Sequence, residues 1–267
     1  MVLKSVFKKG DISICNTDAI CFVLLFLTAV SCMDGKKNYQ VYDIMLWKET
    51  AAWDFAECIS NGDFDEAASL IKEKKVDVDF KEPRFGATLL SWAILNDNYK
   101  AVKFLVDHGA NPNSHDFYDG RSPIFYAASE FCSKEILRYL LEHDGNPNDY
   151  VNEHEVLSHG RSIETPLTGA AFIDIEKTKM LVDAGADVNF SVEAGWTPYF
   201  KAAIKPRMDV LEYLVFNCTM DYRKTFVVTL DTKDTLYLKE LIMTNSVVHP
   251  DDSVIAERIL NYINTHY

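Results

Sequence analysis

A segment of about 33 residues recurs along most of this chain, and this repetition constrains the fold more than any other feature. The clearest unit runs from Gly86 to Asn113. Apolar residues at helical spacing predict one short helix after Thr88 and a second through Leu105, and Gly109 occupies the position of a left-handed helix cap. One pair of such short helices buries too little apolar surface to be stable alone. We therefore expect neighbouring copies to stack side by side.

Further copies repeat the same order of a Thr or Ser opening, two short helices and a turn rich in Gly, Asn and Asp. They begin at Gly120, Thr165 and Gly195 and close near Asn148, Asn189 and Asp221. A more polar, degraded copy from Ala51 to Asp79 suits a capping repeat, whose outer face meets water. The longest interval, between the openings at Gly120 and Thr165, carries an insertion at residues 149–162.

The C-terminal segment, residues 222–267, predicts a cap at the other end. We interpret Phe226–Leu230 and Leu236–Ile242 as one more degraded helix pair, and Asp252–Ile263 as an amphipathic helix. The chain as a whole predicts an all-α solenoid of about five to six repeats. This domain spans residues 51–267, with capping helices at both ends, and follows a linker and lead-in helix at residues 32–50.

Two short motifs within the repeats carry a family resemblance. Thr165-Pro-Leu167, followed by Ala170-Ala171 and then by the Gly-Ala-Asp-Val-Asn close at Gly185–Asn189, resembles the ankyrin repeat. The resemblance implies stacked helix pairs with finger-like turns, and a non-enzymatic module that binds another protein.

The chain departs from the ankyrin pattern at one recurrent position. The family usually has His after Thr-Pro-Leu, and this chain has Ser91, Phe125, Thr168 and Phe200 there. That His typically links neighbouring turns by hydrogen bonds. The resemblance therefore implies less rigid junctions between the repeats of this chain.

Five large side chains are the expected contacts to a protein partner. As the ankyrin resemblance implies, the turn tips and the exposed side of each first helix line a groove, and residues just before each opening or just after each Ala pair point into it. Aromatic residues and Arg dominate binding energy at many interfaces. The candidates are Phe85, Tyr118, Arg121, Phe172 and Trp196. Packing between the repeats is the alternative for Phe172.

The charge of the chain limits the classes of partner. The net charge is −13, and 48% of the residues are hydrophobic, which argues against wholesale disorder. An acidic chain without a basic cluster repels phosphate backbones, so we expect no nucleic-acid partner, and basic proteins are favoured instead. Nucleotide-binding and nucleophile motifs are absent, so we expect no cofactor and no small-molecule substrate.

Two histidines in the insertion suggest a second hypothesis. His154 and His159 flank a sequence similar to the zinc-protease signature, which needs two His four residues apart on one helical face. Here the interval is one residue longer, so the signature fails and we predict no metal site. A loop could still bring the two side chains together. A metal-dependent hydrolase using this His-rich insertion is therefore the alternative to a binding module.

The N-terminus predicts export. Residues 1–31 combine a Lys-containing start, a short apolar run and small residues, which is typical of a secretory signal. Ala29-Val-Ser-Cys32 resembles a bacterial lipobox, which implies lipidation of Cys32 and membrane association through a lipid anchor only. We expect a cell-envelope location, in the periplasm or at the outer membrane, where the chain would act as an immunity protein or a scaffold. A secreted protein and an effector acting in a host cell, with an uncleaved anchor, are the alternatives.

Overall fold

The structure is a computed structural model, and it describes residues 43–128, 132–151, 164–191, 197–221, 226–228, 235–248 and 250–266. Residues 1–31, Cys32 and most of the 149–162 insertion lie outside the described residues, so the signal, the lipidation and the insertion stay predictions. In the described part of the chain, no helix is both long enough and apolar enough to cross a membrane.

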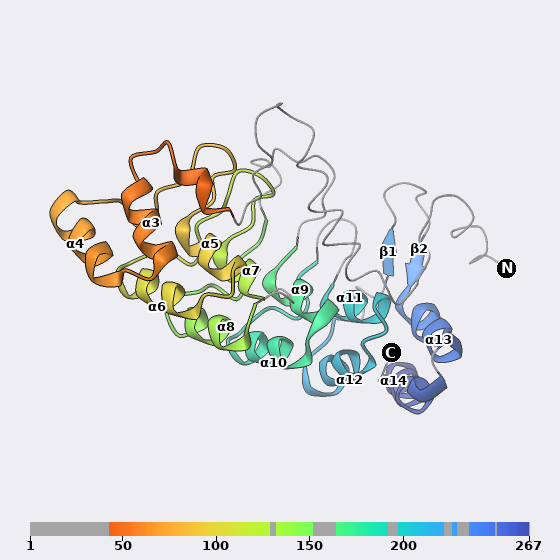
Figure 1. Cartoon of the computed structure of the whole chain (residues 1–267). Helices are drawn as coiled ribbons and strands as arrows, with labels where there is room; N and C mark the ends of the chain where they lie inside the picture. Colours follow the sequence, from red (N-terminus) through yellow and green to blue (C-terminus); the bar gives the residue numbers. More distant parts are fainter. Residues whose placement is uncertain are drawn as a thin grey trace.

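The described elements form successive helix pairs after a short 3-10 helix, η2 (Ile44–Trp47) (Figure 1). The pairs are α3 (Trp53–Asn61) with α4 (Phe64–Lys74), α5 (Leu89–Leu95) with α6 (Tyr99–Asp107), α7 (Pro123–Ala127) with α8 (Lys134–Leu141), α9 (Pro166–Ile173) with α10 (Ile175–Asp183), and α11 (Pro198–Ile204) with α12 (Met208–Asn217). A two-stranded hairpin, β1 (Phe226–Val228) and β2 (Thr235–Tyr237), precedes α13 (Leu238–Val248), the short 3-10 helix η5 (Pro250–Asp252) and α14 (Ser253–His266).

Equivalent helices of neighbouring pairs pack against one another and build a solenoid. The first helices α5, α7, α9, α11 and α13 contact each other in that order, and the second helices α6, α8, α10, α12 and α14 form a parallel row (Figure 1). Ala93, Ala127, Ala170 and Ala202 occupy equivalent positions in the first helices and are fully buried. These small side chains allow the first helices to approach closely, so the stacked architecture predicted from the repeat is confirmed.

Two of the first helices, α5 and α9, begin with hydroxyl caps. The Thr88 Oγ1 accepts a hydrogen bond from the Ser91 backbone N–H at 3.2 Å, and Thr165 and Thr168 form a reciprocal capping box. Ser91 and Thr168 stand where the ankyrin pattern has His. Their hydroxyl groups therefore stabilise the local helix start and do not reach the next repeat.

A row of Asn and Asp side chains links the repeats instead. Each accepts a hydrogen bond from a backbone N–H of the following repeat, at the turn after the second helix. The pairs are Asp79 with Asn111 N (2.9 Å), Asn113 with Asn146 N (2.8 Å), Asn148 with Asp187 N (2.6 Å) and Asn189 with Asp221 N (2.6 Å). The three Asn side chains also donate through Nδ2 to carbonyls across the same junctions. We call this row the asparagine ladder.

Removing one rung of the asparagine ladder should destabilise the fold. Asn148→Ala deletes the bonds to Asp187 N and to Gly185 O, and we expect the free energy of unfolding to fall by about 2 kcal/mol, since each hydrogen bond is worth about 1 kcal/mol net. Urea unfolding followed by far-UV circular dichroism measures the loss. Asn61→Ala, at an exposed position at the end of α3, is the control. Equal losses in the two variants would contradict a role for the ladder.

The C-terminal cap differs from the sequence prediction in one place. Residues 226–228 form an extended strand that pairs antiparallel with residues 235–237, so the helix predicted from Phe226 is wrong there. Val227 and Val228 are β-branched and favour an extended backbone when no helix face requires them. The helices predicted over Leu236–Ile242 and Asp252–Ile263 are present as α13 and α14, within one or two residues of their predicted starts.

Candidate protein-binding surface

The first helices and the loops that precede them form one side of the solenoid, which we call the first-helix face (Figure 1). Residues 80–87, before α5, form finger 1. Residues 114–122, before α7, form finger 2. Three of the five predicted partner contacts, Phe85, Tyr118 and Arg121, lie in fingers 1 and 2, and the structure gives them different environments.

Phe85 and Tyr118 pack together between the two fingers. Their ring centroids are 5.6 Å apart and their planes meet at 84°, an edge-to-face pair. Phe85 is only 5% exposed, because finger 2 covers it. Tyr118 is half-buried and packs against the hydrophobic core. Phe85 therefore supports the surface from below, while Tyr118 forms part of it.

Arg121 joins an ion-pair chain that crosses three repeats. Its Nε lies 3.5 Å from Asp119 Oδ2, and its Nη2 lies 3.2 Å from Glu164 Oε2. Glu164 continues the chain to Lys201 at 2.8 Å. The guanidinium also lies over the Phe125 ring, 4.6 Å from its centroid. Arg121 therefore links the repeats through internal contacts, with about a fifth of its side chain exposed.

A buried pair of carboxylates lies at the base of finger 2. Asp116 Oδ1 accepts hydrogen bonds from the backbone N–H groups of Tyr118 and Asp119, both at 2.9 Å, and of Gly120 at 3.1 Å. The Tyr126 hydroxyl bridges the pair, 2.6 Å from Asp116 Oδ2 and 3.2 Å from Asp119 Oδ1. Burial and the neighbouring Asp119 charge raise the pKa of Asp116 to about 7. Finger 2 is thus anchored by a carboxyl group that titrates near neutral pH.

His115 connects finger 2 to the next repeat. Its Nε2 lies 3.0 Å from Asp149 Oδ1, and its Nδ1 lies 2.7 Å from the Gly120 carbonyl. The hydrogen bond to Asp149 raises the pKa of His115 above its usual value. Ser122 donates to the other oxygen of Asp149. Because the Asp149 carboxylate lies between the two side chains, His115 and Ser122 do not form a nucleophile and base pair.

The remaining predicted site residues fall at the edges of the described structure. Phe172, at the end of α9, is half-buried, and Lys205 Nζ lies 4.9 Å from its ring centroid. Phe172 is therefore partly packed against the solenoid and partly exposed. Trp196, His154 and His159 lie outside the described residues. Among the residues that the structure describes, no group of three or more His, Cys, Asp or Glu is arranged to hold a metal ion.

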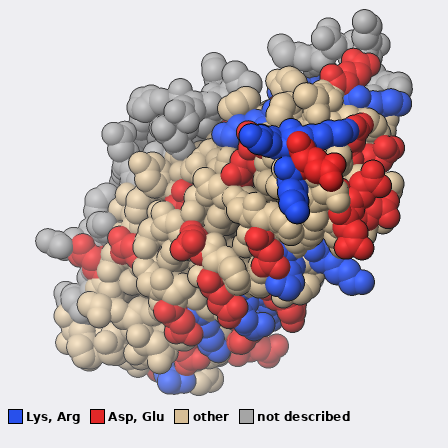
Figure 2. Space-filling view, turned by 90° about the vertical axis from the view of Figure 1, so that its left-hand side faces the viewer, with Lys and Arg blue, Asp and Glu red and all other residues tan. Residues whose placement is uncertain are grey.

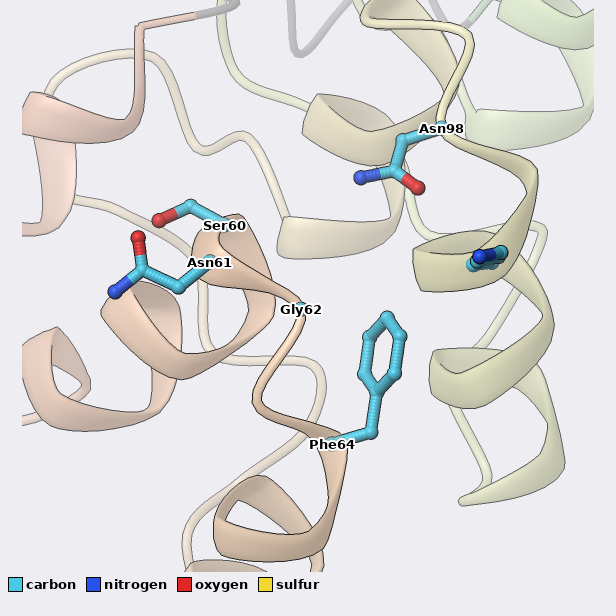
Figure 3. Close-up of a pocket in the computed structure, with 6 residues that line it drawn as sticks. Ser60, Asn61, Gly62, Phe64 and Asn98 are labelled. Carbon is cyan, nitrogen blue, oxygen red and sulfur yellow. The ribbon is translucent and has the colours of Figure 1, made fainter.

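A shallow hollow lies away from the first-helix face, between the α3–α4 turn and the α5–α6 turn (Figure 3). Ser60, Asn61, Gly62, Phe64, Asn98 and Lys100 line it. The Phe64 ring stacks on Phe104, with centroids 5.1 Å apart. Lys100 is the only titratable group in the lining, so the hollow offers no acid and base pair for catalysis.

The end of the solenoid that carries α3 and α4 is mixed in charge. Acidic side chains are spread over this face, with one group of Lys and Arg in its upper part and further ones among the acidic residues below (Figure 2). An extended basic stripe, which a nucleic acid would need, does not run across the described residues of this view.

Two residues important for the surface were missed by the sequence analysis, namely Lys81 in finger 1 and Phe117 in finger 2. Phe117 is 45% exposed, and Lys81 Nζ lies 5.1 Å from its ring centroid. The signal that could have found them is the repeat register, since Lys81 and His115 occupy equivalent positions of successive fingers and Phe117 adjoins Tyr118.

Comparison with known proteins agrees with this geometry. Residues 55–151 match the family model of ankyrin repeats, in three copies. A crystal structure of an ankyrin repeat domain from Acinetobacter baumannii superimposes with a TM-score of 0.59 at 20% identity, over 80% of this chain and 97% of that one. The fold is that of an ankyrin-repeat solenoid. Ankyrin repeats are protein-interaction modules, and this solenoid presents the fingers and first helices through which such modules act.

The curated relatives share only parts of their length with this solenoid. The ankyrin repeat protein FPV014 of fowlpox virus is 30% identical over 133 residues, 49% of this chain and 28% of that protein. Protein phosphatase 1 regulatory subunit 27 of Mus musculus is 33% identical over 87 residues, 33% of this chain and 54% of that protein. Glycerophosphocholine phosphodiesterase GDE1 of Eremothecium gossypii is 37% identical over 75 residues, 28% of this chain and 6% of that enzyme. The chain therefore spans about half the length, or less, of each of these relatives.

Proposed function

We propose that this ankyrin solenoid is a non-enzymatic module that binds another protein across fingers 1 and 2 and the first-helix face. The observation that carries the proposal is the continuity of this face: the Arg121, Glu164 and Lys201 ion pairs join three repeats into one surface. A surface fixed in advance loses little conformational freedom on binding, which favours affinity. The mouse relative, whose name describes a regulatory subunit, is in keeping with a protein that acts through a partner.

The cellular setting is a separate part of the proposal. We propose that Cys32 carries a lipid anchor and that the solenoid faces a partner in a bacterial envelope, as an immunity protein for a toxin or as a scaffold. The apolar run before Cys32 and the lipobox-like motif support this. Mass spectrometry of the mature N-terminus is the test: an acylated Cys32 is expected, and an intact Met1 would contradict the anchor.

Site-specific photo-crosslinking tests the binding face. A benzophenone amino acid is placed at Tyr118 or Phe172 on the proposed face, and at Tyr99 or Phe216, exposed on the second helices, as matched controls. In extracts of the source organism, we expect a discrete protein adduct from the first two positions and none from the controls. Adducts from the second-helix positions alone, or from all four positions equally, would contradict the proposed face.

A further inference from the structure

Fingers 1 and 2 together build a small surface of aromatic and cationic side chains. Lys81, Arg84 and Phe85 come from finger 1, and Phe117 and Tyr118 come from finger 2. We call these five residues the finger platform. Phe117 is the large hydrophobic side chain that the platform exposes most, at 45%.

The two halves of the finger platform are held together by backbone contacts. The Phe117 N–H donates to the Phe85 carbonyl at 2.7 Å, and Lys81 Nζ donates to the His115 carbonyl at 2.7 Å. Gly86 has a φ of 72°, and a Cβ added there would lie 2.5 Å from the Phe117 ring. Only glycine allows this close approach. The platform is therefore preorganised before any partner arrives.

Both cations of the platform lie over aromatic rings. Lys81 Nζ is 5.1 Å from the Phe117 ring centroid, and Arg84 Cζ is 5.1 Å from the Phe85 ring centroid. No ion pair joins Lys81 or Arg84 to a carboxylate in the described part of the chain, although the Asp79 carboxylate, just before finger 1, interacts electrostatically with Lys81. The rings restrict where the cations lie without neutralising them.

The carboxylates of the two fingers are directed inward, away from these cations. Glu82 is fully buried and accepts the backbone N–H groups of Arg84 at 2.7 Å and Phe85 at 2.6 Å. Asp116 is buried in the same way below finger 2 and accepts the Tyr118 N–H at 2.9 Å. The surface of the platform therefore carries positive charge on a chain whose net charge is −13.

We propose that the finger platform docks an acidic segment of a protein partner, with an apolar side chain against Phe117 and carboxylates at Lys81 and Arg84. This inference rests on the proposed binding function and names the chemistry of the ligand. The net charge of the chain favours basic partners at long range, and the platform is a local exception. At physiological ionic strength, charges more than about 8 Å away are largely screened, so the nearest cations decide which segment binds.

A nucleic acid fits the platform less well than an acidic protein segment. Phosphate backbones need a row of cations, and the platform offers two. The surrounding acidic body repels a long polyanion at many points, whereas a short acidic segment meets only the platform. Oligonucleotide binding is therefore an outcome that the experiment must be able to detect.

Selection from a phage-displayed random peptide library on the full chain tests the proposal. We expect enriched peptides to combine Asp or Glu with an aliphatic or aromatic residue. Lys81→Met with Arg84→Met keeps the apolar stems but removes both charges, and should weaken binding of an enriched peptide about ten-fold or more. Phe117→Ala should weaken it by a similar factor. Lys72→Ala with Lys100→Ala, two exposed lysines elsewhere, is the charge-matched control and should bind as the parent does.

Each other outcome overturns the proposal. Basic or uncharged peptides, no enrichment, or equal binding by the Lys81→Met and Arg84→Met variant would exclude an acidic ligand at the platform, provided that melting shows the variant folded. Displacement of the peptide by a single-stranded oligonucleotide would favour a nucleic acid. Peptides that bind elsewhere on the first-helix face, together with photo-crosslinks at Phe172, would keep the proposed function and remove only the platform.

Discussion

Replacing Arg121 by alanine is expected to destabilise the solenoid by about 3 kcal/mol, because removing one partner of a buried ion pair leaves the other charge uncompensated. Asp119 is only 1% exposed and would lose its cation, and Glu164 would keep Lys201 alone. The Phe125 ring would also lose the guanidinium that covers it. Urea unfolding of the variant and the parent at neutral pH measures the difference.

Two further variants separate the charge of Arg121 from its geometry. Arg121→Lys keeps the charge but cannot contact two carboxylates with one planar group, so we expect an intermediate loss. In a double-mutant cycle with Glu164→Gln, the two losses should sum to more than the loss in the double variant, since the partners touch. A loss below about 1 kcal/mol in Arg121→Ala would show that Arg121 behaves as an ordinary surface residue.

Replacing Asp116 by asparagine is expected to remove a large part of the pH dependence of stability. The pKa of Asp116 is about 7 in the folded chain, whereas the pKa of an aspartate in an unfolded chain is about 3.9. Between these values the folded state binds the extra proton, so stability falls as the pH rises from about 4 to 7. Three pH units correspond to about 4 kcal/mol. Asp116→Asn cannot ionise, and it should be more stable than the parent at pH 8 and similar to it at pH 4.

The geometry of Asp116 suits this substitution. The amide oxygen can keep the three backbone N–H donors, and the amide nitrogen can donate to the Tyr126 hydroxyl. Urea unfolding at several pH values gives the two profiles, and their difference reports the ionisation of Asp116 together with its smaller effect on the pKa of His115. Asp119→Asn is the matched control and should be destabilised at pH 8, since Arg121 loses one of its two carboxylate partners. Parallel profiles for Asp116→Asn and the parent would contradict the prediction.

Prediction from the sequence succeeded where a residue pattern is local and periodic. The helix pairs, the Thr and Ser openings and the stacking order follow from apolar spacing that repeats along the chain. It was less successful in the C-terminal cap, where Val227 and Val228 lie in a strand: the degraded repeat gives a weak helical signal, and pairing with residues 235–237 decides the conformation. It also missed the asparagine ladder, because each Asn by itself is ordinary turn chemistry.

The candidate surface was predictable as a region and not residue by residue. The repeat register directed attention to the fingers, and the binding role of that region stays a prediction. It could not tell that Phe85 is covered by finger 2, that Arg121 is held by Glu164 from the next repeat, or that Lys81 and Phe117 meet across two fingers. Each of these facts depends on contacts between residues about one repeat apart, which no local pattern encodes.

By itself the sequence determined that this chain is a stack of short helix pairs, because such pairs bury enough apolar surface only when neighbours share it. The tertiary structure alone decided which charges face each other, which are buried and which remain at the surface. The physical reason is that a side chain's charge and burial are set by its neighbours in space, and in a solenoid those neighbours belong to the adjoining repeats.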